Sequence, residues 1–161
     1  LPAINDRAGL ATYFKFHTSD YRWDSPRYKG AILHCVDKKT SKQAKKLLKK
    51  TPEKEWAEVL RQTFNTSGEE KIQVEQGIFA DGDNKYIDKL VFKKGDFDPL
   101  MSYPFTIAVG KKQKGPEDYR EVIDQVRKDY RNYLNAYWER ELRESGKVEI
   151  NQEVLKTVNN N

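Results

Sequence analysis

Residues 27–36 read RYKGAILHCV, and this stretch is the clearest strand candidate in the chain. Its apolar side chains follow no helical period: Ala31, Ile32, Leu33 and Val36. Because neighbouring residues on a strand point to opposite faces of the sheet, His34 and Cys35 cannot form a contacting pair within one regular strand. Cys35 is the only cysteine in the chain, and we expect it to be a buried small apolar residue.

One helix is predicted before this first strand, and further helices and strands are predicted after it. Upstream, residues 4–20 carry apolar side chains at helical spacing after an Asn5 or Asp6 cap and predict a short leading helix. Thr51 is the expected N-cap of a downstream helix, with Pro52 at its first position. The other downstream patterns predict helices at 41–50 and 52–64, a strand at 71–79, a short helix at 85–92, and two short strands, or one strand and an extended arm, at 98–102 and 103–112.

A long helix is predicted from Pro116 to Ser145. Its apolar stripe recurs at three and four residues: Tyr119, Val122, Val126, Tyr130, Tyr133, Leu134, Tyr137, Trp138 and Leu142. We expect this stripe to pack on the core of the preceding strand-containing domain and on the leading helix, with the binding of client peptides as the alternative. An extended segment, GKVEI at 146–150, and a final helical turn, NQEVLKTV at 151–158, are expected after the helix.

Composition and charge limit the classes of function. The 161 residues amount to one domain's worth of chain, and the formal net charge of +5 permits an acidic partner without demanding one. No RNA-stacking motif accompanies that charge, so we expect no nucleic-acid partner. One cysteine excludes an internal disulfide and a cysteine-rich zinc pattern. No apolar run approaches the roughly 18–20 residues of a bilayer span, and a chain that begins with Leu1 indicates a processed or cloned piece whose signal peptide would lie upstream.

The order of predicted elements over residues 27–111 resembles that of a parvulin-type peptidyl-prolyl isomerase domain, less one helix. The run QGIFADGDNKYIDKLVFKKGDFDPL at 76–100 and the later YPFTIAVGKK at 103–112 look like the parvulin sequence in which a Gly-Phe turn leads to a helix, KKGD and a closing strand. The flanking helices and the ending YWERELRESGKVEINQEVLKTV at 137–158 resemble the C-terminal part of SurA-like envelope chaperone-isomerases.

The resemblance implies an α+β fold with a small antiparallel or mixed four-stranded sheet, flanking helices, a short leading helix and a long C-terminal helix. It divides the chain into a leading helix and linker at 1–26, a parvulin-like domain at 27–112, and the long helix and tail at 113–161. It also implies rotation of X–Pro bonds and the escort of unfolded envelope proteins in the periplasm. The expected partners are unfolded or proline-containing polypeptides and other domains of the same chain upstream of Leu1, with no cofactor.

The site of this family has a His on the first strand, a His on the last strand and a central Cys or Asp. His34 is the nearest match to the first of these, although aligning Ile32 and Leu33 with the family's Ile-Leu pair places Ala31 there. The closing strand contains Thr106 and no His. The apolar wall that would bind the Pro ring is expected from Phe92, Leu100, Met101 and Phe105.

These departures predict a degenerate active site that binds clients rather than turning them over. One alternative is an active isomerase that uses His34 and an apolar Pro pocket. Another is a basic binding module for acidic surfaces or nucleic acid, for which the lysines of residues 38–50 are the candidates; otherwise these lysines form the solvated face of a helix. We expect no metal, because the cluster of Asp81, Asp83, Asn84 and Asp88 lacks the final Glu of a calcium loop.

Overall fold

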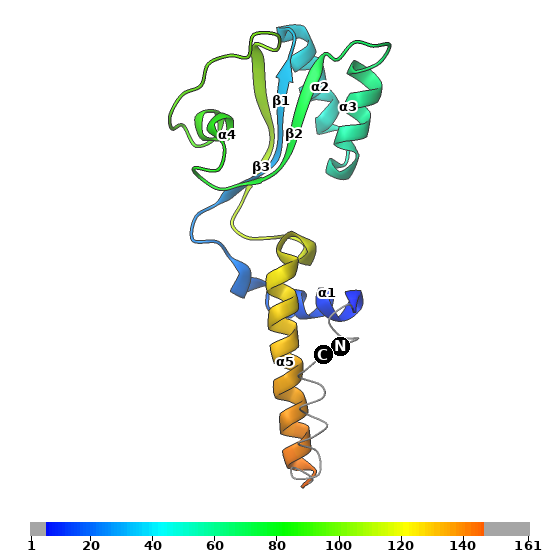
Figure 1. The fold of residues 1–161 in the computed structure, drawn as a ribbon, viewed down its shortest axis with the longest axis vertical. Coiled ribbons are helices and arrows are strands. Elements are labelled where there is room, and N and C mark those ends of the chain that lie inside the picture. The colour runs from blue at the N-terminus through cyan, green and yellow to red at the C-terminus, as the bar shows by residue number, and fades with distance from the viewer. Residues whose placement is uncertain (1–5, 147–161) are drawn as a thin grey trace. The chain divides into compact units, whose positions relative to one another are not determined.

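An antiparallel sheet with helices on both faces is the main feature of the computed structural model, which describes residues 6–146 (Figure 1). The helices are α1 (Arg7–Phe16), α2 (Lys38–Lys49), α3 (Trp56–Phe64), α4 (Lys85–Leu90) and α5 (Ile123–Glu144), and the strands are β1 (Arg27–Cys35), β2 (Ile72–Phe79) and β3 (Phe105–Gln113). Short 3-10 turns add η2 (Thr18–Tyr21), η3 (Glu53–Glu55) and η4 (Tyr119–Val122). The chain divides into two compact units, one of residues 1–22 and 115–161 and the other of residues 23–114.

β1 is the central strand of the sheet, whose order is β2-β1-β3. It is buried along most of its length, whereas β2 and β3 are edge strands with several exposed residues. Gly30 of β1 pairs with Gly77 of β2 on one side and with Gly110 of β3 on the other. A Cβ atom on Gly30 would lie 2.2 Å from the Val109 carbonyl oxygen. The backbones of β1 and β3 therefore approach more closely here than a side chain permits.

The alternation of side chains along β1 divides the core between the two faces of the sheet. On one face, α2 and α3 cover a cluster of apolar residues: Ala31, Leu33, Cys35, Ala44, Leu48, Trp56, Leu60, Phe64, Ile72 and Val109. On the opposite face, α4 covers a smaller cluster: Tyr28, Ile32, Phe79 and Ile87 (Figure 1). The predicted burial of Cys35 is confirmed, since this residue is fully buried in the first cluster.

The starts of α2 and α3 differ from the predicted ones because of two side chains. The Asp37 carboxylate accepts a hydrogen bond from the Thr40 backbone N–H at 2.7 Å, so α2 begins at Lys38 rather than at residue 41. The prediction of Thr51 as an N-cap was wrong. Its hydroxyl donates to the Leu47 carbonyl oxygen at 2.8 Å and satisfies the end of α2, and α3 begins only after the η3 turn.

The four-stranded sheet that the resemblance implies is reduced to three strands in the part of the chain that the structure describes. Residues 98–102 form no strand, and β3 begins after Pro104. Pro99 and Pro104 lack the backbone N–H group that pairing with a neighbouring strand requires. The Tyr103 hydroxyl instead donates to the Glu70 carbonyl oxygen at 2.8 Å. The fold is α+β, with a three-stranded antiparallel sheet, flanking helices and a long C-terminal helix.

The other unit consists of α1 and α5, which pack around a small apolar cluster: Leu10, Phe14, Tyr21 and Val126. The Tyr21 hydroxyl donates to the Asp129 carboxylate at 2.7 Å, so a polar link from η2 accompanies the apolar contact. The α-helix begins at Ile123 rather than at Pro116, because the Asp118 side chain caps the η4 turn that precedes it. Asn5 and the segments predicted beyond Gly146 lie outside the described residues.

We predict that Gly30→Ala destabilises the sheet and that Gly77→Ala does not. The methyl group added at residue 30 would meet the backbone of Val109 and Gly110, which cannot yield unless two strands separate, so the free energy of unfolding should fall by about 1–3 kcal/mol. At residue 77 the nearest atom is on the Phe79 ring at 3.5 Å, an ordinary contact. Urea denaturation of both variants beside the wild type measures the difference, and equal losses would contradict the close approach.

Candidate functional site

His34 lies on the face of the sheet that α4 covers, and only 7% of its surface is exposed. A hydrogen bond of 2.7 Å joins its Nδ1 to Oγ1 of Thr106, the directly paired residue of β3. The Tyr86 ring of α4 meets the imidazole edge to face, with ring centroids 4.6 Å apart. This enclosure of His34 between β3 and α4 is the candidate site that the sequence singled out.

The position of Tyr86 follows from the cap of α4. The Asn84 side chain accepts hydrogen bonds from the backbone N–H groups of Tyr86 and Ile87, at 2.9 and 3.2 Å, and so fixes the first turn of this short helix. Ile87 is fully buried in the cluster on the sheet and anchors the helix there. The Phe97 ring also contacts Tyr86, with centroids 4.7 Å apart, so Tyr86 joins Phe97 and His34 in one aromatic group.

Burial keeps the imidazole of His34 and the thiol of Cys35 uncharged. It lowers the pKa of His34, and the nearby Glu75 carboxylate opposes this shift only in part. Burial also raises the pKa of the Cys35 thiol to about 11, so the thiol stays protonated at neutral pH. The two side chains lie on opposite faces of β1, as the alternation predicts. They therefore form no pair of nucleophile and base.

The structure does not bring together the four residues that were expected to form a Pro-binding wall. Phe92 is partly buried against the cluster under α4. Phe105 shares the alternation of β3 with Ile107 and so belongs to the opposite face of the sheet. Met101 is 100% exposed, and Leu100 is half-buried in the same connecting segment. An apolar wall of this composition is therefore not assembled beside the candidate site.

The two possible matches to the family's first-strand His lie on opposite faces of β1. Ala31 is fully buried in the cluster under α2 and α3, whereas His34 faces α4. Sequence reasoning missed Thr106 as the partner of His34. The two glycines could have predicted this partner, because pairing Gly30 with Gly110 in an antiparallel sheet places residue 34 opposite residue 106.

A second candidate surface lies on α1 and α5. A groove of about 680 Å³ is lined by small and aromatic residues of both helices, among them Gly9, Tyr13, Phe16, Tyr130, Tyr133 and Leu134. Farther along α5, Tyr137 and Trp138 follow, and together with Tyr133 they are 42–50% exposed. The packing predicted for this stripe holds at Val126, which is fully buried, and at Tyr133, whose ring lies 5.6 Å from the Tyr13 ring of α1. Tyr137 and Trp138 are about half exposed.

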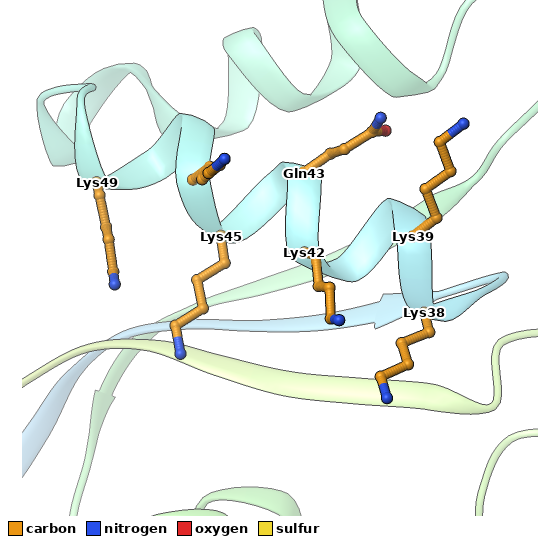
Figure 2. A pocket seen from close by; sticks show the side chains of 7 residues that line it. Lys38, Lys39, Lys42, Gln43, Lys45 and Lys49 are labelled. Carbon is orange, nitrogen blue, oxygen red and sulfur yellow. The ribbon is translucent and has the colours of Figure 1, made fainter.

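A third candidate surface is the basic face of α2 (Figure 2). Six lysines and Gln43 line a hollow of about 670 Å³: Lys38, Lys39, Lys42, Lys45, Lys46 and Lys49. Among the salt bridges of residues 6–146, none includes a lysine of α2. Figure 2 shows four of these side chains extending to one side of the helix and Lys39 extending away from them.

The acidic turn before α4 uses its carboxylates internally. Asp83 and Asp88 accept hydrogen bonds from backbone N–H groups of the same turn at 2.8 and 2.9 Å, and Asp81 pairs with Lys94. Within residues 6–146, no group of three or more His, Cys, Asp or Glu side chains is placed to hold a metal ion. No helix in the same range is both long and apolar enough to cross a membrane.

Comparison with known proteins finds no match to this chain among protein-family models, curated proteins or solved structures.

We predict that the fold loses stability as the pH falls through the range in which His34 titrates. The pKa of His34 is lower in the folded protein than in the unfolded chain, where it is about 6.5, so the unfolded chain binds more protons between the two values. This contribution is complete above about pH 6.5 and is lost progressively as the pH falls toward the folded-state pKa.

His34→Asn is the matched variant, because Asn can keep a hydrogen bond to Thr106 and does not titrate. Between about pH 8 and about pH 5, its melting temperature should change less than that of the wild type. Calorimetry across this range makes the comparison, and identical pH dependence in the two proteins would contradict a neutral, buried His34.

Proposed function

We propose that this chain is a folding-factor module of the parvulin-like class that binds extended client polypeptides in the bacterial envelope and does not turn them over. The observation that carries the proposal is the exposed aromatic surface of α1 and α5. Tyr133, Tyr137 and Trp138 are about half exposed beside a groove that is itself lined by aromatic side chains. Side chains of this kind each remove about 150–250 Å² from water when they are buried, so the surface favours an apolar partner.

The dimensions of this surface suit an extended segment. From Tyr130 to Trp138 the helix rises by about 12 Å, at about 1.5 Å per residue. An extended chain covers the same distance in about four residues. Aromatic or aliphatic side chains at alternate positions of a client would then meet the exposed rings of α5. Unfolded envelope proteins offer many such segments, and no defined sequence is required for this contact.

The order of elements in the sheet unit supports membership of the parvulin-like class. β1, α2, α3, β2, α4 and β3 follow one another as the resemblance implies, with one helix and one strand fewer. The finer assignment to that class rests on this order and on the sequence runs at 76–100 and 103–112.

The surroundings of His34 support binding without turnover. Rotation of a peptide bond has a barrier of about 18–20 kcal/mol. A site lowers it only by binding the twisted bond better than the planar one. Here the imidazole is already hydrogen-bonded to Thr106 and covered by Tyr86, and the expected Pro wall is dispersed. The second His of the family's site is absent from β3.

We predict that neither the wild type nor His34→Ala accelerates the rotation of X–Pro bonds. Exchange NMR on a short Ala-Pro peptide should show the uncatalysed interconversion, which takes about 10–100 s at 25 °C, in both cases. Acceleration by the wild type that disappears in His34→Ala would instead establish the alternative, an active isomerase that uses His34.

We predict that Tyr137→Ala combined with Trp138→Ala weakens client binding about tenfold, because truncated aromatic anchors cost more than most other contacts. The probe is a fluorescein-labelled peptide with aromatic residues at alternate positions, followed by anisotropy. Asn132→Ala is the control, since Asn132 is exposed and lies about 200° around the helix from Tyr130. Unchanged affinity in the double variant would refute client binding at this surface.

A further inference from the structure

The exposed face of α2 and of its C-cap carries positive charge and no negative charge. Eight exposed residues form this lysine face: Lys38, Lys39, Lys42, Gln43, Lys45, Lys46, Lys49 and Lys50. At about 100° per residue, these eight positions fill an arc of about 160° around the helix axis. The rest of the circumference holds buried or half-buried residues: Thr40, Ser41, Ala44, Leu47 and Leu48.

The lysines of this face form two rows along the helix. The first row lies within an arc of about 60° and consists of Lys38, Lys42, Lys45 and Lys49. Figure 2 shows these four side chains extending to the same side of the helix. The second row lies about 90° further around and consists of Lys39, Lys46 and Lys50. Seven positive charges therefore lie along about 18 Å of helix.

This arrangement lowers the stability of the helix. Four pairs of these lysines are four residues apart and three pairs are three residues apart, which are the spacings at which like charges destabilise a helix. Lys38 and Lys39 also lie in the first turn, where the helix dipole disfavours cations. A negatively charged partner outside the helix would relieve both effects.

Other helices of the chain balance their charges internally. Salt bridges on α3 and α5 join residues three or four positions apart: Glu58–Arg61, Asp124–Arg127 and Glu139–Arg143. Over residues 6–146, none of the salt bridges includes a lysine of α2, although Glu53 lies beside Lys45 and Lys49 at the end of the helix. Most of the charge on the lysine face is therefore not neutralised within the described part of the chain.

We propose that the lysine face of α2 binds the surface of an anionic phospholipid bilayer by electrostatic attraction, without entering the hydrocarbon. Four to eight basic residues on an amphipathic helix are typical of sites for acidic lipid headgroups. Each lysine close to such a surface raises the affinity about fivefold. The inference concerns residues 23–114 alone, so it does not depend on the client surface of α1 and α5.

The use of lysine without arginine favours a lipid surface over a partner whose anions have fixed positions. Residues 38–50 contain no arginine, whereas α5 contains four. The planar guanidinium group matches a fixed carboxylate or phosphate, and arginine is enriched in protein interfaces from which lysine is depleted. Lipid headgroups diffuse within the bilayer and can gather around each ammonium group, so no fixed geometry is required of them.

The lysine face also has no aromatic or large apolar side chain. Proteins hold single-stranded nucleic acids by stacking the bases on aromatic side chains, and no such side chain is present among residues 38–50. A helix that enters the membrane interface does so with Trp, Phe or Leu on its apolar face. The leucines of α2 are Leu47 and Leu48, and both pack in the cluster on the sheet. The contact is therefore with the headgroups alone.

The first test compares binding of the full chain to two kinds of vesicle by sedimentation. One kind is phosphatidylcholine alone, and the other contains about one-third phosphatidylglycerol. We expect the anionic vesicles to bind at least about 30-fold more tightly at about 0.1 M salt. This preference should disappear at about 1 M salt, where the Debye length falls from about 10 Å to about 3 Å. Equal binding to the two kinds of vesicle at the lower salt overturns the proposal.

Two double variants then locate the contact. Lys42→Gln combined with Lys46→Gln removes two charges from the middle of the lysine face and should weaken binding to the anionic vesicles at least about tenfold. Lys85→Gln combined with Lys89→Gln is the matched control, because it removes the same charge from α4, which covers the opposite face of the sheet. The control should change the affinity less than about twofold, and equal losses in the two variants contradict binding through α2.

Calorimetry on the same variants provides the second readout. Because Lys42 and Lys46 are four residues apart and repel each other, their replacement should leave the melting temperature unchanged or raise it. A lower melting temperature in this variant would show that the lysines serve the fold, and the proposal would fail. It also fails if a DNA duplex or polyglutamate binds through Lys42 and Lys46 while the anionic vesicles do not.

Discussion

The close approach of β1 and β3 at Gly30 is the constraint on which the rest of the sheet unit depends. Because no side chain fits between the two backbones there, Gly30 must lie opposite Gly110, and the pairing of the other residues follows. Thr106 then faces His34, and Phe105 faces Cys35. A slip of one residue would move every side chain of β3 to the other face of the sheet. The glycine pair therefore decides which side chains lie under α4 and which join the cluster under α2 and α3.

The same register determines the chemistry around His34. The Thr106 hydroxyl lies at hydrogen-bond distance from His34. Tyr86 contacts the His34 ring because Ile87, the next residue of α4, is buried against the sheet. A buried imidazole with a neutral partner is most stable without a proton, which accounts for its lowered pKa. The contact of the His34 ring with Tyr86 thus helps to hold α4 on the sheet. The hydrogen bond of His34 to Thr106 stabilises the packed interior.

Local patterns in the sequence predict much of this fold, and pairing over long distances accounts for what they miss. The lack of a helical period in RYKGAILHCV predicts the strand, and the alternation of side chains along a strand predicts the separation of His34 from Cys35, because both depend only on neighbouring residues. The grouping of Phe92 with Phe105 came from the family resemblance. Strand alternation places Phe105 on the face of the sheet that α2 and α3 cover, whereas Phe92 packs on the face that α4 covers. The partner of His34 lies 72 residues away, so it needs the register that the glycines impose.

The burial of His34 and the exposure of Tyr133, Tyr137 and Trp138 together indicate where a ligand can gain free energy on binding. A substrate at His34 would first have to displace the Thr106 hydroxyl and the Tyr86 ring, and exchanging one hydrogen bond for another yields little net stabilisation. An exposed aromatic ring gains the full benefit of burial when a partner covers it. A ligand would therefore gain more free energy at the exposed aromatic side chains of α1 and α5 than at His34.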